Sequence, residues 1–172
     1  MSRSSLFAAT LLLFAFAAPH ARAADAKPCA DAAHHQFDFW IGDWDAFDAA
    51  APGKGPVARN HVDAILGGCA LREDYVQADG LHGESFTIYD ASRKLWHQSW
   101  VTNRGELLVL EGHRRGNRIV LEGETTTAAG KHRVRAFWEP QDGDVREIAS
   151  TSSDGGKTWT PLFDIVFRKH RR

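Results

Sequence analysis

Residues 131–152 read KHRVRAFWEPQDGDVREIASTS, and this stretch decides the fold class. Val134, Ala136 and Trp138 occupy alternate positions, and Arg133 and Arg135 occupy the positions of the other parity. Side chains on a β-strand point alternately to the two faces of a sheet, so this spacing predicts a strand with one apolar face. The Asp-Gly-Asp sequence at residues 142–144 is typical of a tight turn. The stretch therefore predicts a β-hairpin.

The same pattern continues through most of the chain. Beyond residue 36, turn signals built from Gly, Asp, Asn or Pro recur at short intervals, and they separate segments rich in Val, Ile, Phe, Trp and Thr. No segment in this part keeps an apolar period of 3.6 residues for long enough to indicate a helix. Ten strands are predicted, at residues 39–48, 57–66, 69–78, 82–90, 94–102, 106–113, 117–125, 131–139, 144–152 and 159–169.

Consecutive hairpins favour an up-and-down arrangement of these strands. Closing such a sheet removes the exposed edges that an open sheet would present to other chains. We therefore predict an all-β fold, a closed antiparallel up-and-down β-barrel of about ten strands of the lipocalin or fatty-acid-binding type. It should form one domain over residues 24–172.

The N-terminus has the three parts of a secretory signal peptide, predicted over residues 1–23. Arg3 precedes an unbroken apolar run over residues 6–18, and Ala21-Arg22-Ala23 provides a small-x-small cleavage site. The run is shorter than the ~20 apolar residues that a transmembrane helix needs. We expect cleavage near Ala23, a periplasmic or secreted location, and no insertion into a membrane.

Charge and cysteine content bear on the partners and the redox state of the exported part. Removal of the signal peptide takes away two arginines and no acid, so the net charge changes from −1 to −3 and indicates no nucleic-acid partner. Cys29 and Cys69 are the only cysteines in the sequence. Two cysteines in an oxidising compartment predict one disulfide, and two buried free thiols are the alternative.

Apolar residues at alternate positions indicate which side chains face the barrel interior. Three strands give a clear pattern, with inward positions expected at Phe86 and Ile88, at Val134, Ala136 and Trp138, and at Phe163, Ile165 and Phe167. Asp164 and Arg168 are expected on the outer face of the last strand.

Two other strands bring polar groups to the inward face. Their inward positions are expected to be Leu71, Glu73 and Tyr75 in one strand and Trp96, Gln98 and Trp100 in the other. Arg146 shares a face with Ile148 and is a further candidate for the interior. Burying a carboxylate, an amide, a phenol and a guanidinium among indoles is costly unless these groups are paired.

Two interpretations of the polar interior remain open. Apolar walls with a few convergent polar groups are typical of a small-molecule site, here lined by Glu73, Tyr75, Trp96, Gln98, Trp100, Trp138 and Arg146. Alternatively, Glu73 bonds to Arg146 or Gln98 in an internal network that only fixes the strand register.

Several motifs resemble a known type of exported barrel. Residues 37–45 (FDFWIGDWD) contain a G-x-W sequence, and they are followed by Gly67-Gly68-Cys69, by residues 96–100 (WHQSW) and by an Asp-box hairpin at residues 152–159 (SSDGGKTW). We interpret the single Asp box as a structural hairpin rather than a sugar site. Together the motifs resemble a family of uncharacterised exported bacterial proteins with a lipocalin-like, calycin-type β-barrel, and the resemblance spans residues 29–168.

The resemblance implies roles for two residues and raises the question of haem. In calycins the G-x-W tryptophan packs across the closed end of the barrel beneath a cation from the last strand, which implies that Trp44 is the end-cap and Arg168 its partner. Nitrobindin-like barrels hold haem through a His near the C-terminus. The only His there, His170, lies beyond the last predicted strand, so no haem or other cofactor is expected.

No complete catalytic or metal-binding motif occurs in the sequence. The nine histidines form neither H-x-H nor H-E-x-x-H, so no metal site is expected. Glu73 and Glu147 are two carboxylates of unknown separation, which is a poor signal for an acid–base pair. We expect a barrel that binds a small hydrophobic or aromatic ligand. The alternatives are an enzyme that uses Glu73 as a general acid or base, and a filled-core domain that acts through its surface.

Overall fold

A computed structural model describes residues 27–171 of the chain, so the predicted signal peptide lies outside the described residues. The ten strands are β1 Gly42–Asp48, β2 Ala58–Ile65, β3 Ala70–Gln77, β4 His82–Asp90, β5 Leu95–Thr102, β6 Leu107–Arg115, β7 Arg118–Thr127, β8 Gly130–Gln141, β9 Asp144–Ser152 and β10 Thr160–Lys169. Two short 3-10 helices, η1 Asp38–Trp40 and η2 Leu66–Gly68, are the only helical elements in this part of the chain. All ten predicted strands are confirmed, with ends that differ by at most three residues.

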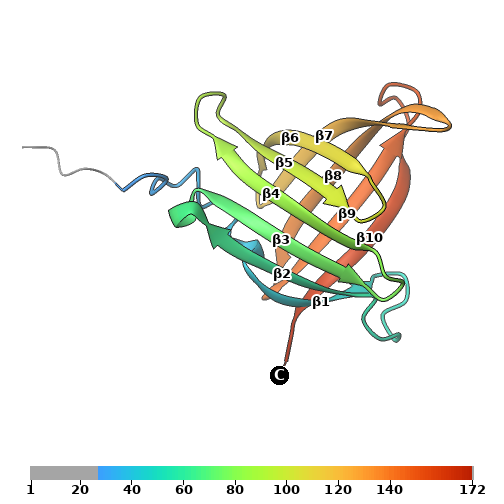
Figure 1. Cartoon of the computed structure of the whole chain (residues 1–172), viewed down its shortest axis with the longest axis horizontal. Coiled ribbons are helices and arrows are strands. Elements are labelled where there is room, and N and C mark those ends of the chain that lie inside the picture. The colour runs from blue at the N-terminus through green and yellow to red at the C-terminus, as the bar shows by residue number, and fades with distance from the viewer. Residues whose placement is uncertain (1–26, 172) are drawn as a thin grey trace, which may run out of the picture.

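The strands form a closed antiparallel barrel (Figure 1). Each strand pairs with its neighbours in the sequence, and β1 pairs with β10 to close the sheet. The closing register places Trp44 opposite Lys169 and Ala46 opposite Phe167. The predicted up-and-down barrel is therefore confirmed.

One end of the barrel, the closed end, is filled by an aromatic plug. The plug consists of Phe37, Trp40, Trp96, Trp138 and Phe167, each nearly inaccessible to solvent. The Phe37 ring stacks on Trp40 at 5.3 Å between centroids and meets Trp96 and Trp138 edge-on. Aromatic rings bury large areas and favour these offset and edge-to-face arrangements, so residues 37–40 seal this end of the sheet.

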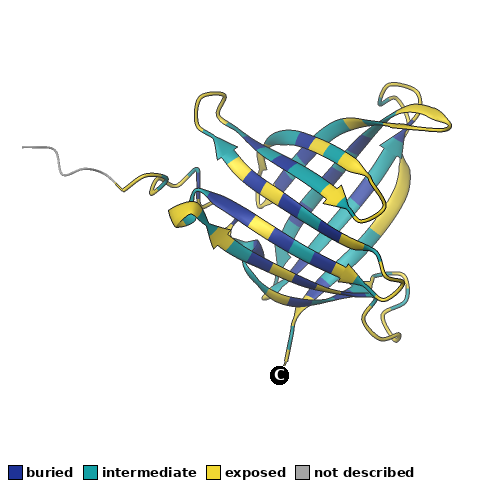
Figure 2. Cartoon of the chain, in the orientation of Figure 1, coloured by how far each residue is buried: buried dark blue, intermediate teal, exposed yellow. Residues whose placement is uncertain are grey.

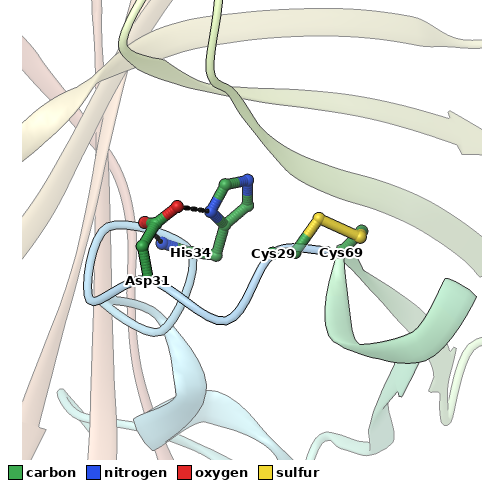
Figure 3. Close-up of a disulfide and its surroundings, with 4 residues drawn as sticks. All are labelled: Cys29, Asp31, His34 and Cys69. Carbon is green, nitrogen blue, oxygen red and sulfur yellow. Dashed lines mark hydrogen bonds and ion pairs between the residues drawn. A yellow bond between two sulfur atoms is a disulfide. The ribbon is translucent and has the colours of Figure 1, made fainter. Parts of the chain in front are cut away.

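A disulfide fastens the plug segment to the barrel wall. Cys29 and Cys69 are joined across a sequence separation of 40 residues, which confirms the predicted pair (Figure 3). The turn that follows Cys29 is held by Asp31, whose carboxylate lies 2.9 Å from Nδ1 of His34 (Figure 3). The segment that leads into η1 is therefore tied to the loop between β2 and β3.

The opposite end, the open end, is bordered by loops 49–57, 78–81, 103–106, 128–129 and 153–159. The last of these loops is the Asp box. Asp154 accepts hydrogen bonds from the backbone N–H groups of Lys157 and Thr158 at 3.0 and 2.9 Å. Arg135 covers the Trp159 ring, with its Cζ 4.1 Å from the centroid. These contacts lie within the hairpin and the strand beside it, as a structural role requires.

Burial alternates along the strands (Figure 2), but the predicted inward face of β4 is wrong. Ser85 and Thr87 are buried inside, whereas Phe86 and Ile88 are 50% and 38% exposed on the outer face. The prediction assumed that the larger apolar side chains point inward. Small hydroxyl groups can be buried where they are hydrogen bonded, and Gln98 provides that partner for Thr87.

The predicted inward position of Arg146 is also wrong. The interior positions of β9 are Val145, Glu147 and Ala149, so Arg146 lies on the outer face. Its Nε and Nη2 donate to the two carboxylate oxygens of Asp164 on β10, at 2.8 and 2.6 Å. Such a bidentate contact satisfies the guanidinium without burying it.

The end-cap residue has a different partner from the one expected. Trp44 is buried, and its indole Nε1 donates to the Trp40 carbonyl at 3.0 Å. Lys169, which is opposite Trp44 in the β1–β10 register, places its Nζ 4.9 Å from the ring centroid. Arg168 points to the other face of β10 and covers Phe47 at 4.6 Å, so the predicted pairing of Trp44 with Arg168 is wrong.

Candidate functional site

A cavity of about 860 Å³ lies inside the barrel between the aromatic plug and the open end. Most of its wall is apolar, formed by Leu108, Leu110, Val134, Ala136, Ala149, Ile165 and the inner faces of Trp138 and Phe167. Ligand cavities in proteins commonly have volumes of roughly 300–1,000 Å³ and mainly apolar walls. The interior therefore has the size and lining of a small-molecule site.

Exposed apolar side chains surround the cavity at the open end. Leu107 and Leu162 are 63% and 52% exposed, and both line the cavity together with Phe163. Val57 and Leu81 complete this rim from the loops that precede β2 and β4. Because the plug closes the other end, the rim is the side from which a ligand would enter.

Two aromatic residues stand just inside the rim. Tyr75 on β3 meets Trp100 on β5 edge-on, with ring centroids 6.0 Å apart. Gly83, on the strand between them, leaves room for the indole, because a Cβ atom there would lie 2.2 Å from a Trp100 ring carbon. The absence of a side chain at Gly83 therefore fixes where the Trp100 ring can lie.

The Tyr75 hydroxyl is available to a ligand. Tyr75 is 8% exposed and lines the cavity, and none of residues 27–171 forms a hydrogen bond with its hydroxyl. Burial, with the nearby charges of Glu147 and Glu73, raises the pKa of the Tyr75 phenol well above its ordinary value. The phenol therefore stays neutral and can both donate and accept a hydrogen bond.

Glu73 is held in a buried polar network. It is 5% exposed, and its carboxyl accepts hydrogen bonds from Asn60 Nδ2 at 3.1 Å and from the Ser85 hydroxyl at 2.8 Å. Gln98 Nε2 donates to Ser85 and Thr87, so Gln98 reaches Glu73 only through Ser85. Glu73 therefore lies in an internal network, but its direct partners are Asn60 and Ser85 and not Arg146 or Gln98, as the alternative from sequence expected.

Burial makes Glu73 a carboxyl group that gains and loses its proton near neutral pH. Burial raises the pKa of Glu73 to about 7 against the opposing effect of the Ser85 and Asn60 hydrogen bonds. Asn60 Oδ1 is buried and has no hydrogen-bond partner in the described part of the chain. Rotation of this amide would let Oδ1 accept a hydrogen bond from a protonated Glu73.

Glu147 is the second carboxyl group in the cavity, and it is less well satisfied. Among residues 27–171, no donor gives it a hydrogen bond of normal geometry, and Trp138 Nε1 on the paired strand is also buried without a partner. Burial and the nearby Glu73 charge raise the pKa of Glu147 well above its ordinary value, against a lowering effect of the Trp138 indole. The sequence analysis names Glu147 but leaves it out of the pocket, because it places Arg146 inside and adjacent residues on a strand face opposite ways.

Apart from Tyr75, the ionisable side chains that line the cavity are all carboxylic acids. They are Asp48, Glu73, Glu106, Glu147 and Asp164, and no Lys, Arg or His is found among the described lining residues. Asp164 is neutralised from outside by Arg146. The remaining carboxyl groups run from the rim to the cavity floor without a cationic partner in the lining.

The cavity brings together five of the seven residues predicted to line a pocket, namely Glu73, Tyr75, Gln98, Trp100 and Trp138. Trp96 belongs to the plug, where its indole N–H donates to the Gln36 side chain at 3.2 Å. Arg146 borders a smaller hollow of about 260 Å³ on the outer surface, together with Phe47 and Arg168.

His97, Glu111 and Ser99 form a hydrogen-bonded cluster on the outer face of the barrel, with the residue types of a catalytic triad. The His97 Nδ1 lies 2.8 Å from a Glu111 carboxylate oxygen and its Nε2 lies 2.9 Å from the Ser99 hydroxyl. A serine hydrolase also needs N–H donors for the developing oxyanion. Because β5 pairs with both β4 and β6, its backbone N–H groups are used in the sheet. We assign no catalytic role to this cluster.

No protein-family model matches the sequence, and no curated protein is detectably similar to it. The resemblance to exported lipocalin-like proteins therefore stays a prediction, whereas the barrel rests on the strand topology. Within residues 27–171, His, Cys, Asp and Glu side chains do not gather in threes as metal ligands would. The helices in this part of the chain lack the length and apolar character needed to span a membrane.

Proposed function

We propose that the protein binds a small apolar or aromatic molecule inside its barrel, in the periplasm or outside the cell. The observation that carries the proposal is the cavity of about 860 Å³ with apolar walls and an apolar rim. A domain that acted only through its surface would have no need of this space, because protein interiors are normally close-packed. The disulfide fits an oxidising compartment.

Preorganisation is a second argument for binding. The plug, the disulfide and the closed sheet hold the floor and the walls in place without a ligand. Binding to such a preformed site does not have to order loops or rotate many side chains, which are common costs of association. The exposed leucines of the rim give an apolar molecule its first contact.

Binding can be tested by titrating the purified protein with N-phenylnaphthylamine, a neutral fluorescent probe whose emission rises in apolar surroundings. We expect saturation at one probe per chain. Ala136→Phe, which fills the cavity, should abolish the signal, and Val109→Phe on the outer face of β6 should preserve it. Probe binding that is unaffected by Ala136→Phe in a folded variant would contradict the proposal.

Acid–base catalysis in the same cavity is a second candidate function. The observation that favours it is the pKa of Glu73, which burial raises to about 7 and which suits proton transfer at neutral pH. Mass spectrometry of a bound compound before and after incubation tests this candidate. Chemical conversion by the wild type that is lost in Glu73→Gln would establish it, and an unchanged compound would exclude it for that ligand.

A further inference from the structure

We infer that the ligand carries a positively charged amino group, which binds between Glu73, Glu147 and Tyr75 while its apolar body lies against the leucine-lined wall. This inference rests on the proposed function and adds the chemical class of the ligand, a cationic amphiphile. Three observations about the cavity carry it: the acidic character of its lining, the polar groups whose hydrogen-bonding capacity the protein leaves unused, and the aromatic rings of Tyr75 and Trp100.

The carboxyl groups of the lining favour a cation. Asp48 and Glu106 place negative charge at the rim, and no basic side chain in the described lining opposes them. Glu73 and Glu147 lie deeper, and each becomes a negative charge when it gives up its proton. A cleft lined by one sign of charge attracts ligands of the other sign and raises their local concentration. The same field repels fatty acids and other anionic amphiphiles.

The polar groups that line the cavity have more hydrogen-bonding capacity than the protein uses. No hydrogen bond of normal geometry reaches the Tyr75 hydroxyl or the Glu147 carboxyl from residues 27–171, and both side chains face the cavity. Trp138 Nε1, whose indole acts on Glu147, is buried without a partner in this part of the chain, whereas buried polar groups are normally paired. An ammonium group has three N–H donors, and it can satisfy two carboxyl groups and a phenol oxygen together.

A structural role explains Glu73 but not its neighbours. The hydrogen bonds from Asn60 and Ser85 suffice to fix the register of β2, β3 and β4 around Glu73. Glu147 and Tyr75 contribute nothing to that network. Tyr75 and Trp100 also present aromatic rings to the same space, and aromatic rings attract cations.

Binding of a cation should release a proton. In the empty barrel burial keeps Glu73 and Glu147 largely protonated below neutral pH, because the pKa of each carboxyl is raised. A positive charge placed between them favours the ionised form of at least one. Protons released on binding are measurable by calorimetry in buffers with different enthalpies of ionisation.

The test compares three probes that share one apolar body: naphthylethylamine, naphthylethanol and naphthylacetate. At about pH 6.5 we expect the amine to bind at least about tenfold more tightly than the alcohol, and the acetate to bind more weakly than the alcohol. The amine should release up to about one proton per molecule bound, and the alcohol none.

Matched variants distinguish the contribution of the amino group to affinity from that of the apolar cavity. Glu147→Gln and Glu73→Gln should each reduce the affinity for the amine to about that for the alcohol, while binding of the alcohol persists and shows that the barrel is intact. Glu84→Gln, on the outer face of β4, should leave all three affinities unchanged.

The outcomes distinguish this inference from the proposed function. Equal affinities for the three probes, or strongest binding of the acetate, would overturn the assignment of a cationic ligand and leave the binding barrel in place. Failure of all three probes and of N-phenylnaphthylamine to bind would overturn both.

Discussion

Lys169 places its Nζ 4.9 Å from the centre of the Trp44 ring, so the last strand of the barrel closes over the first. Trp44 is buried beneath it and donates a hydrogen bond to the Trp40 carbonyl. Trp44→Ala should lower the free energy of unfolding by about 3–5 kcal/mol, as other truncations of buried aromatic residues do. Urea unfolding followed by circular dichroism measures this loss.

The lysine itself should matter much less than the ring it covers. Lys169→Ala removes an exposed cation–π contact and should cost less than about 1 kcal/mol. Arg168→Ala should leave the Trp44 environment unchanged, because Arg168 contacts Phe47 on the other face. A loss below about 1 kcal/mol for Trp44→Ala would mean that the ring does not seal the closed end.

The disulfide between Cys29 and Cys69 should form in protein recovered from an oxidising compartment. Alkylation without prior reduction should leave both cysteines unmodified in the mass spectrum. The double variant Cys29→Ser, Cys69→Ser should be less stable by about 4 kcal/mol, because the crosslink restricts a loop of 40 residues in the unfolded chain. Complete alkylation of both thiols before reduction would show that the pair is not formed.

The sequence was sufficient to predict the ten strands and their antiparallel order, because the turn residues and the alternation are local signals. It was less reliable about which face points inward. On β4 the apolar Phe86 and Ile88 lie outside and the hydroxyl side chains Ser85 and Thr87 lie inside. A hydroxyl group can be buried in the interior when a side chain on another strand forms a hydrogen bond with it. The sequence of one strand does not show whether such a partner exists.

In β9, too, the sequence did not show which residues face the cavity. Arg146 was assigned to the interior because it shares a face with Ile148, and this assignment turned Glu147 away from the cavity. The choice between the two faces is made by Asp164 on β10, which pairs with Arg146 outside the barrel. The cavity volume is likewise a property of how all ten strands pack, so the sequence could indicate polar groups in the interior but not the space around them.

Stability should depend on pH through Glu73. The carboxyl has an ordinary pKa of 4.5, and burial in the folded barrel raises it to about 7, so the folded state retains a proton that the unfolded chain has lost. The stabilisation is therefore complete below about pH 4.5, declines as the pH rises to about 7, and is absent above that. Asn60, Ser85, Asp74, Tyr75 and Glu147 are the polar or charged groups that act on this carboxyl.

The measurement compares the wild type with Glu73→Gln across this range. Relative to the variant, the wild type should lose roughly 3 kcal/mol of unfolding free energy between about pH 4.5 and 7.5. Glu84→Gln, which removes an outward-facing carboxyl from β4, should follow the wild-type profile. Parallel profiles for wild type and Glu73→Gln would show that Glu73 is not desolvated in the folded protein.

The position of Trp100 should depend on the missing side chain at Gly83. A methyl group there would lie 2.2 Å from the indole, so Gly83→Ala must displace the ring that stands inside the rim. We expect a stability loss of about 1–3 kcal/mol, as in other overpacked interiors. Affinity for naphthylethanol should also fall, by about three- to tenfold, because the wall beside Tyr75 is disturbed.

Gly55→Ala is the matched control for that change. Gly55 lies in the loop between β1 and β2 at the same open end, and an added Cβ would meet none of the described atoms within 4 Å. Its backbone also lies outside the left-handed region, so alanine introduces no strain there. Both stability and affinity should stay at wild-type values in this variant. If Gly83→Ala behaves in the same way, the Trp100 ring is free to move and cannot be part of a preformed wall.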